Sequence, residues 1–347
     1  MTMTDSPLEP VSMDRVKDLV SDLRDAKPAI YLIDLLLSAG VGWALFAYAV
    51  MGAGWVGRLL AFAGAALLLF RALAFIHEIF HQQAMTGFRL LWHALAGVPL
   101  LIPFLLYLPI HQAHHNAKTY GTPQDGEYEQ FLGRCREMST KLYALNVALP
   151  LALLLRFALL TPLSLVFPKV RQEVIPNFVH MALRMPYRAP DIKESARPEA
   201  MRVEFFCAAF GWGLIALALT GHGALLSWWA TLVIAIATLN TVRALCATHL
   251  YVEQAGGRGA RGQMLDSLNI DNAGLLTQLL CPVGLRFHAL HHVAPYLPYH
   301  ALAEAHRRLM AALPPGSEYH WVSVPSLGAG MRRLSEATEG IGPGGEH

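Results

Sequence analysis

Three short histidine clusters carry most of the chemistry that this sequence could perform. They read HEIFH at residues 77–81, HQAHH at residues 111–115 and HALHH at residues 288–292. Spacings of three and four residues place side chains on one face of a helix, so each cluster can present two or three imidazoles toward one point. Isolated histidines in apolar surroundings usually have structural roles, but two identical H-x-x-H-H patterns are difficult to explain in that way. The clusters therefore predict a metal site.

The number of clustered histidines indicates more than one metal ion. Imidazole is a ligand for zinc, copper, iron and nickel, whereas a structural zinc ion takes four ligands. A further single histidine, His249, follows the last long apolar run. We therefore expect two metal ions. The candidate ligands are His77, His81, His111, His114, His115, His249, His288, His291 and His292.

Five acidic residues lie close to these clusters in the sequence. Neutral imidazoles do not cancel the charge of two divalent ions, so nearby carboxylates are expected to offset that charge and to orient the ring N–H groups. Each acid has an alternative interpretation as a solvated loop or turn residue. The candidates are Glu78, Asp125, Glu127, Asp266 and Asp271.

The first cluster, taken alone, also fits an intramembrane zinc protease. In that reading the two histidines of HEIFH bind zinc and Glu78 acts as the general base. Asp125, in the stretch PQDG, would supply a third ligand. This alternative leaves seven clustered histidines without a role. A non-enzymatic metal or haem membrane protein is a third alternative, and the metal content of the protein discriminates among the three.

The elements that must position the histidines are apolar. Hydrophobic residues make up 54% of the 347 residues and charged residues only 15%, against about 25% charged in a typical soluble domain. Four runs are expected to be membrane-spanning helices in two hairpins. They are Ile30–Val50, Arg58–Ile76, Phe205–Leu219 and Ala224–Cys246. No Lys/Arg-rich block of the kind that binds nucleic acid is present in the sequence.

Two further apolar runs are less regular. Leu90–Ile110 contains three prolines, and Leu142–Phe167 contains two prolines and a central Arg156. If only the two hairpins cross, both termini and all three clusters lie on one side with most of the Lys and Arg residues. That asymmetry makes the side cytoplasmic. We therefore expect both runs to be re-entrant or interfacial.

The expected fold is an all-α integral membrane protein with a cytoplasmic, histidine-rich cap. Residues 1–29 are predicted to form a cytoplasmic amphipathic segment, residues 30–313 the membrane domain, and residues 314–347 a loose, polar, Gly-rich tail. The N-terminal segment lacks the apolar core of a signal peptide. The absence of a signal peptide favours a bacterial inner membrane as the expected location, with both termini and the metal site cytoplasmic.

The three clusters, in this order on a chain with two hairpins, resemble the histidine boxes of the membrane fatty acid desaturase superfamily. The resemblance covers roughly residues 30–310 and extends to the single His249. It implies that the nine histidines hold two iron ions, which use O₂ to abstract hydrogen from an unactivated C–H bond of an acyl chain. The simplest expected activity is desaturation of a fatty acid or acyl lipid. Related family members are hydroxylases or decarboxylases that give a terminal alkene.

The sequence departs from the acyl-CoA desaturases of that superfamily at two points. Those enzymes tend to have four residues between the histidines of the first box, where HEIFH has three. They also carry an asparagine one helical turn before the single histidine, where this chain has Leu245. Asn269 or Asn272 could take its place. No fused cytochrome b5 signature is present, so the electron donor is expected to be a separate ferredoxin, rubredoxin or cytochrome b5.

Overall fold

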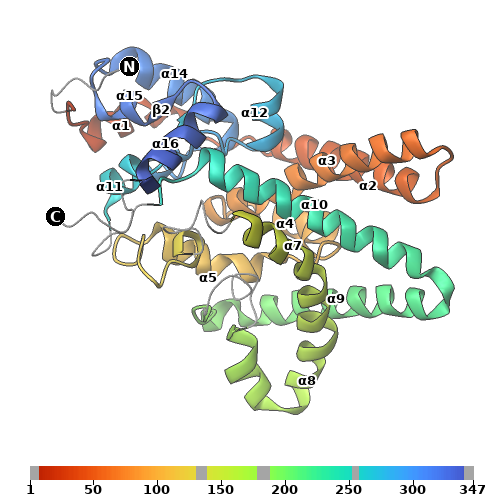
Figure 1. The fold of residues 1–347 in the computed structure, drawn as a ribbon. Helices are drawn as coiled ribbons and strands as arrows, with labels where there is room; N and C mark the ends of the chain where they lie inside the picture. The colour runs from red at the N-terminus through yellow and green to blue at the C-terminus, as the bar shows by residue number, and fades with distance from the viewer. Residues whose placement is uncertain (1–7, 130–138, 178–187, 252–257, 340–347) are drawn as a thin grey trace.

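The structure, a computed structural model, describes residues 8–129, 139–177, 188–251 and 258–339. Helices dominate these residues, and the one sheet among them pairs β1 (Asn269–Ile270) in parallel with β2 (Ser323–Val324). Long helices extend to one side of the molecule, and the C-terminal helices gather at the other (Figure 1). The predicted all-α membrane architecture with a histidine-rich cap is therefore confirmed.

The first hairpin consists of α2 (Pro28–Met51) and α3 (Trp55–His81). Proline at the first position of α2 suits a helix start, because its missing N–H would have no partner there. The outer faces of both helices expose large apolar side chains such as Leu37 and Leu60. Water does not favour such a surface, whereas lipid does, so this hairpin has the surface of a membrane-embedded element.

The second hairpin consists of α9 (Arg197–Leu217) and α10 (Gly223–Ala247). The segment η8 (Ala218–His222) joins them, and Gly221 has a φ of 95° there. Glycine adopts this backbone conformation without the steric cost of a Cβ atom, so the chain can reverse in a short turn. Both predicted hairpins are present.

Among the described residues, four helical stretches are long and apolar enough to cross a membrane. They are Pro28–Met51, Trp55–His81, Tyr143–Val166 and Arg197–Ala247. The last stretch contains both arms of the second hairpin. The sequence prediction did not place a membrane span at Tyr143–Val166, because a single crossing there would move the basic loop that follows it to the opposite side of the membrane.

The Tyr143–Val166 stretch is interrupted. It contains α7 (Ser139–Leu154), the π-helical segment η3 (Leu155–Leu160) and α8 (Thr161–Val166). In Figure 1, α8 lies on the side of α9 that faces away from α10. Arg156 is buried in η3 and pairs with Glu204 of α9, which also pairs with Arg171 at 2.6 Å. The stretch is therefore fastened to α9 by charge, and its interfacial placement stays a prediction.

The other irregular run, Leu90–Ile110, is broken as its prolines suggested. It contains the end of α4 (Thr86–Trp92), the π-helical segment η2 (His93–Gly97), a turn in which Leu101 has a φ of 55°, and the start of α5 (Phe104–His115). No candidate span lies in it. This break lets the chain enter α5, which carries the second histidine cluster.

The cap is built from short helices around the third histidine cluster. Val16 of α1 (Met13–Leu19) and Val20, which follows the helix, are buried with Leu290 and Leu309 in one apolar core. This core fixes the N-terminal segment onto the cap.

The remaining helices of the described chain are α6 (Gly126–Glu129), α11 (Ala260–Leu265), α12 (Leu275–Leu280), α13 (His288–Val293), α14 (Leu302–Ala312), α15 (Glu318–Val322) and α16 (Leu327–Glu339), with η1 (Ser21–Leu23), η4 (Val170–Val174), η5 (Ile175–Asn177), η7 (Glu194–Ala196) and η9 (Tyr299–Ala301).

The expectation of a loose tail from residue 314 is wrong for the residues that the structure describes up to 339. Tyr319 and Val322 of α15 are fully buried, and α16 packs against α10. A Cβ atom at Gly330 would lie 2.3 Å from the carbonyl oxygen of Cys246, so this close approach requires glycine. The polar, Gly-rich composition of the segment hid these contacts. Residues 340–347 lie outside the described residues.

Candidate metal centre

Four elements bring the nine candidate histidines together. The first cluster lies at the C-terminal end of α3 and the second in the last turns of α5. The third cluster forms most of α13, and His249 follows α10 by two residues. All nine side chains are buried or half-buried. The helix ends therefore deliver imidazoles to one place at the boundary between the long helices and the cap.

The imidazoles divide into two groups. Within each group, one ring nitrogen per residue lies within 4.8 Å of the corresponding atoms of the others. This spacing lets every member of a group contact one central ion. The first group is His77, His81, His111, His115 and His291, and the second is His114, His249, His288 and His292. The division fits the prediction of two metal ions from the number of histidines.

Several of these nitrogens have no hydrogen-bond partner among the described residues. They are Nδ1 and Nε2 of His77, Nε2 of His114, Nδ1 of His288 and Nδ1 of His291, and all are buried. Elsewhere, Nε2 atoms face one another, at 2.9 Å between His249 and His288 and 3.2 Å between His115 and His291. Buried polar atoms normally have partners. A cation in each group would satisfy the ring nitrogens that face it, one on each imidazole.

Polar groups behind the histidines determine which ring nitrogen carries the proton. The Nδ1 atom of His111 lies 2.9 Å from Oε1 of Glu127, and Nδ1 of His292 lies 3.0 Å from Oε1 of Gln263. These oxygens accept a hydrogen bond from Nδ1–H, which leaves the Nε2 lone pair directed into the group. Two such lone pairs facing each other repel, whereas a metal ion between them is bound. The donor set therefore fits two metal ions.

His114 has a charged partner. Its Nδ1 atom lies 2.9 Å from Oδ2 of Asp125, and neither side chain is exposed. The same carboxylate accepts hydrogen bonds from the backbone N–H groups of Gly121 and Tyr128. Burial alone would lower the pKa of His114, but the nearby carboxylates of Asp125, Glu127 and Asp266 together outweigh it and raise that pKa, Asp125 contributing most. Asp125 is thus held by its own loop in position to orient this imidazole.

His249 is oriented through an intermediate tyrosine. The hydroxyl of Tyr120 donates to Oδ2 of Asp266 at 2.9 Å, and its oxygen lies 3.0 Å from Nδ1 of His249. The hydroxyl of Ser267, which donates to the Gln263 carbonyl, lies at the same distance from that Nδ1. Both hydroxyl oxygens are therefore free to accept from Nδ1–H, and the Nε2 atom of His249 is left for a metal.

Burial favours the form of imidazole that binds metals. It lowers the pKa of His288, His291 and His292 well below the usual value for histidine. The neighbouring histidines act in the same direction, since each protonated ring disfavours the next. Metal binding requires neutral imidazole, so little free energy is spent on deprotonation.

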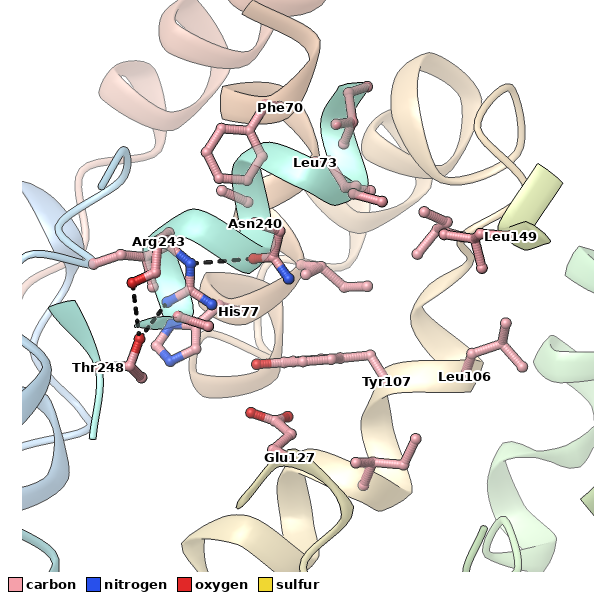
Figure 2. A pocket seen from close by; sticks show the side chains of 18 of the residues that line it. Phe70, Leu73, His77, Leu106, Tyr107, Glu127, Leu149, Asn240, Arg243 and Thr248 are labelled. Carbon is pink, nitrogen blue, oxygen red and sulfur yellow. Dashed lines mark hydrogen bonds between the residues drawn. The ribbon is translucent and has the colours of Figure 1, made fainter. Parts of the chain in front are cut away.

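An apolar cavity of about 190 Å³ opens onto both groups. His77 of the first group and His249 and His288 of the second line it. Figure 2 shows the apolar side chains Phe70 and Leu73 on one wall and Leu106 and Leu149 on another, with His77, Arg243 and Thr248 gathered at one end. A long apolar molecule in this cavity would have part of its length against the metal-binding groups.

Comparison with known proteins decides the family. The fatty acid desaturase family model matches residues 53–323, which include all nine histidines. The chain belongs to the fatty acid desaturase family. It is also 36% identical over 322 residues to a ceramide hydroxylase of Caulobacter vibrioides (strain NA1000 / CB15N). The aligned region covers 89% of each chain. The superfamily that the three histidine clusters resembled is thereby confirmed.

Two of the five predicted acidic residues do not orient a histidine of this desaturase-family centre. The carboxylate of Glu78 accepts from the hydroxyl of Tyr31 at 2.6 Å and from the backbone N–H of Tyr299 at 3.1 Å. Asp271 pairs with His306 at 2.9 Å. Adjacency in sequence suggested both acids, but Glu78 points to the other side of α3, and Asp271 lies beyond β1. Asp125 and Glu127 contact site histidines directly, and Asp266 acts through Tyr120.

The amide oxygens of both asparagines suggested as substitute ligands accept hydrogen bonds from backbone N–H groups. The Oδ1 atom of Asn269 accepts from the backbone N–H of Leu290, and that of Asn272 accepts from the N–H of Gly274. Sequence reasoning also missed the neutral partners Tyr107, Tyr120, Gln263 and Ser267. No motif marks such residues, because hydroxyl and amide groups occur throughout the chain.

Proposed function

We propose that this protein is a membrane-bound, O₂-dependent di-iron hydroxylase that acts on the acyl chain of a ceramide-like lipid. The observation that carries the proposal is the pair of buried imidazole groups at one end of an apolar cavity. The cavity suits an alkyl chain, and the histidines suit two iron ions. The name of the Caulobacter relative supports hydroxylation of a ceramide, since the two chains align over most of their length.

The proposed ligands are the five histidines of the first group for one iron and the four of the second group for the other. Iron bound there would activate O₂ for removal of hydrogen from a C–H bond. In hydroxylation one oxygen atom enters that bond and the other leaves as water, at the expense of two electrons and two protons. Apolar side chains such as Phe70 and Leu106 hold the alkyl chain and exclude water from the reaction.

Desaturation is the second candidate, and it was the simplest expectation from the sequence. The family model that matches the chain bears the name of fatty acid desaturases. Both reactions begin with removal of hydrogen from the alkyl chain by a metal centre with the same histidine ligands. The histidines therefore do not distinguish the two reactions. Formation of a terminal alkene by decarboxylation has no support from the relative.

The zinc protease alternative has weaker support. Its general base would be Glu78, whose carboxylate is occupied by Tyr31 and Tyr299. Its third ligand would be Asp125, whose Oδ2 atom is bonded to His114 and to a backbone N–H. A one-zinc site also leaves the second histidine group unused.

The cellular setting follows from the proposed reaction. The electrons come from a separate donor of the ferredoxin, rubredoxin or cytochrome b5 type. We propose a bacterial inner membrane as its location, and the distribution of Lys and Arg around the two hairpins supports an orientation with both termini and the iron site on the cytoplasmic side.

The test is a reconstituted reaction with isotopically labelled O₂. Purified, iron-loaded protein is supplied with a ferredoxin, its reductase and an N-acyl sphingoid lipid, and the lipid is analysed by mass spectrometry. We expect a product that gains one labelled oxygen atom and is absent with the His291→Ala variant. A product that loses two hydrogen atoms without oxygen would select desaturation, and an unchanged lipid would contradict both candidates.

A further inference from the structure

The polar lining of the cavity is concentrated beside the histidines, at the end of α10. The Nε atom of Arg243 donates to Oδ1 of Asn240 at 3.1 Å, and its Nη1 atom donates to the hydroxyl of Thr248 at 3.4 Å (Figure 2). Thr248 immediately precedes the candidate ligand His249. This polar cluster, defined as Arg243, Asn240 and Thr248, therefore lies next to the metal-binding groups.

Arg243 retains hydrogen-bond donors for a ligand. A guanidinium group has five N–H donors, and the two bonds above use one donor on Nε and one on Nη1. Within the described part of the chain, no carboxylate forms an ion pair with Arg243. Glu127 lines the same cavity; its carboxylate is hydrogen-bonded to His111 and attracts Arg243 from beyond ion-pair distance. A half-buried cation in an apolar cavity gains most from an oxygen acceptor that enters with the substrate.

Away from the histidines, the side chains that line the cavity are apolar. Phe70 and Leu73 precede His77 by seven and four residues on the same face of α3, and all three line the cavity. At a rise of about 1.5 Å per residue, Phe70 lies roughly 10 Å along the helix from His77. Ile236 precedes Arg243 by seven residues on α10, lines the cavity and is buried in the same apolar core as Phe70. The cavity thus has one polar end, at the histidines, and one apolar end.

We propose that the polar cluster binds the carbonyl oxygen of the substrate's acyl group, so that the enzyme oxidises a carbon close to that carbonyl. The proposal rests on the function proposed above and adds the position of oxidation. With the carbonyl against Arg243 and the alkyl tail toward Phe70 and Ile236, the carbons that face the histidines are those next to the polar group. Oxidation in the middle of the chain would require the carbonyl to lie far from the histidines, where the cavity lining is apolar.

Two lipids present the same carbonyl chemistry. A ceramide carries it as an amide, and a free fatty acid carries it as a carboxylate. A guanidinium group binds both, and it binds a carboxylate through two parallel hydrogen bonds. Comparison of a ceramide with the free acid of the same chain length therefore identifies which form the site accepts.

The experiment compares wild-type protein with Arg243→Ala and Arg243→Lys. The exposed Arg202 of α9 provides the matched control Arg202→Ala, which removes an arginine outside the cavity. Tandem mass spectrometry locates the oxygen or double bond in the product. Equilibrium binding of each lipid without O₂ or reductant provides a readout that needs no turnover, and metal analysis verifies that each variant holds its iron.

We expect wild-type protein and Arg202→Ala to oxidise a carbon adjacent or nearly adjacent to the carbonyl. Arg243→Ala is expected to weaken lipid binding and raise KM by about tenfold or more, the effect of losing a hydrogen bond to a charged group, with unchanged iron content. Arg243→Lys should recover part of the binding. A wild-type product oxidised in the middle of the chain, or unchanged binding by Arg243→Ala, would overturn the inference. Failure of wild-type protein to oxidise any lipid would contradict the proposed function instead, while the binding measurement would still test Arg243.

Discussion

His114 and Asp125 form a fully buried pair in which Nδ1 and Oδ2 are 2.9 Å apart. The pair connects the end of α5 to the loop that follows it, because the Asp125 carboxylate also accepts from the N–H groups of Gly121 and Tyr128. The Nε2 atom of His114, on the other side of the ring, is buried without a partner among the described residues. This arrangement is expected of a metal ligand with a carboxylate behind it.

Asp125→Asn should weaken metal binding at the second histidine group. The amide keeps an acceptor for Nδ1–H but removes the negative charge that makes the imidazole a stronger ligand. Loss of such a partner typically costs 10–100-fold in metal affinity, so we expect a loss of about that size for one of two ions. Competition with an iron chelator measures it. Asp271→Asn is the matched control, because Asp271 pairs with His306 away from the centre, and equal effects of the two variants would contradict the assignment.

Tyr120→Phe should have a smaller effect than Asp125→Asn. The variant removes one acceptor for Nδ1–H of His249 and leaves the Ser267 hydroxyl, which lies at the same 3.0 Å distance. Adding Ser267→Ala removes both acceptors, so the double variant should lose more iron affinity than the sum of the single variants. The same chelator competition provides the measurement. Simple additivity would indicate that the two hydroxyls do not share this proton.

Glu78→Gln should leave measurable oxidase activity and iron content. The glutamine side-chain oxygen still accepts hydrogen bonds, whereas Glu78→Ala leaves the buried Tyr31 hydroxyl and the half-buried Tyr299 N–H without this acceptor. Each unsatisfied group costs about 1–3 kcal/mol of the free energy of unfolding. The unfolding temperature in detergent should therefore fall much further for Glu78→Ala. Complete loss of activity in a well-folded Glu78→Gln protein would instead point to a general base, as in a zinc protease.

Glu204→Leu should destabilise the protein more than Arg156→Met. Removal of Glu204 leaves Arg156 buried without its carboxylate, whereas removal of Arg156 leaves Glu204 paired with Arg171. An unpaired buried charge costs about 3–5 kcal/mol, so the unfolding temperature should show this order. Glu199→Gln breaks a half-exposed pair with Arg89 and is expected to cost less than about 1 kcal/mol. The reverse order for the two buried variants would exclude this account of how α9 is fastened to η3.

The sequence predicted the parts of the structure that depend on periodic or clustered residue types. The two hairpins follow from apolar runs separated by Gly-rich turns, and the nine histidines follow from their spacing. Asp125 and Glu127 were predicted from their nearness in sequence to the second histidine cluster, residues 111–115. The prediction succeeds because the loop of residues 120–129 folds back onto that cluster. In these cases local sequence and tertiary contact coincide.

The remainder depended on contacts between distant segments. Glu78 is adjacent to His77, but its carboxylate bonds to residues 31 and 299 from two other elements. The segment from 314 is polar and Gly-rich, yet Gly330 allows α16 to approach the carbonyl of Cys246. Neither contact leaves a periodic signal, because each depends on which surfaces the fold brings together.

The central claim is tested most directly by the metal content of the purified chain. Iron and zinc are measured by elemental analysis after expression in iron-supplemented medium, with His291→Ala as the variant that removes one proposed ligand. The account predicts close to two irons per chain and a clear loss of iron in the variant. One zinc per chain without iron, or an iron content that His291→Ala leaves unchanged, would contradict it.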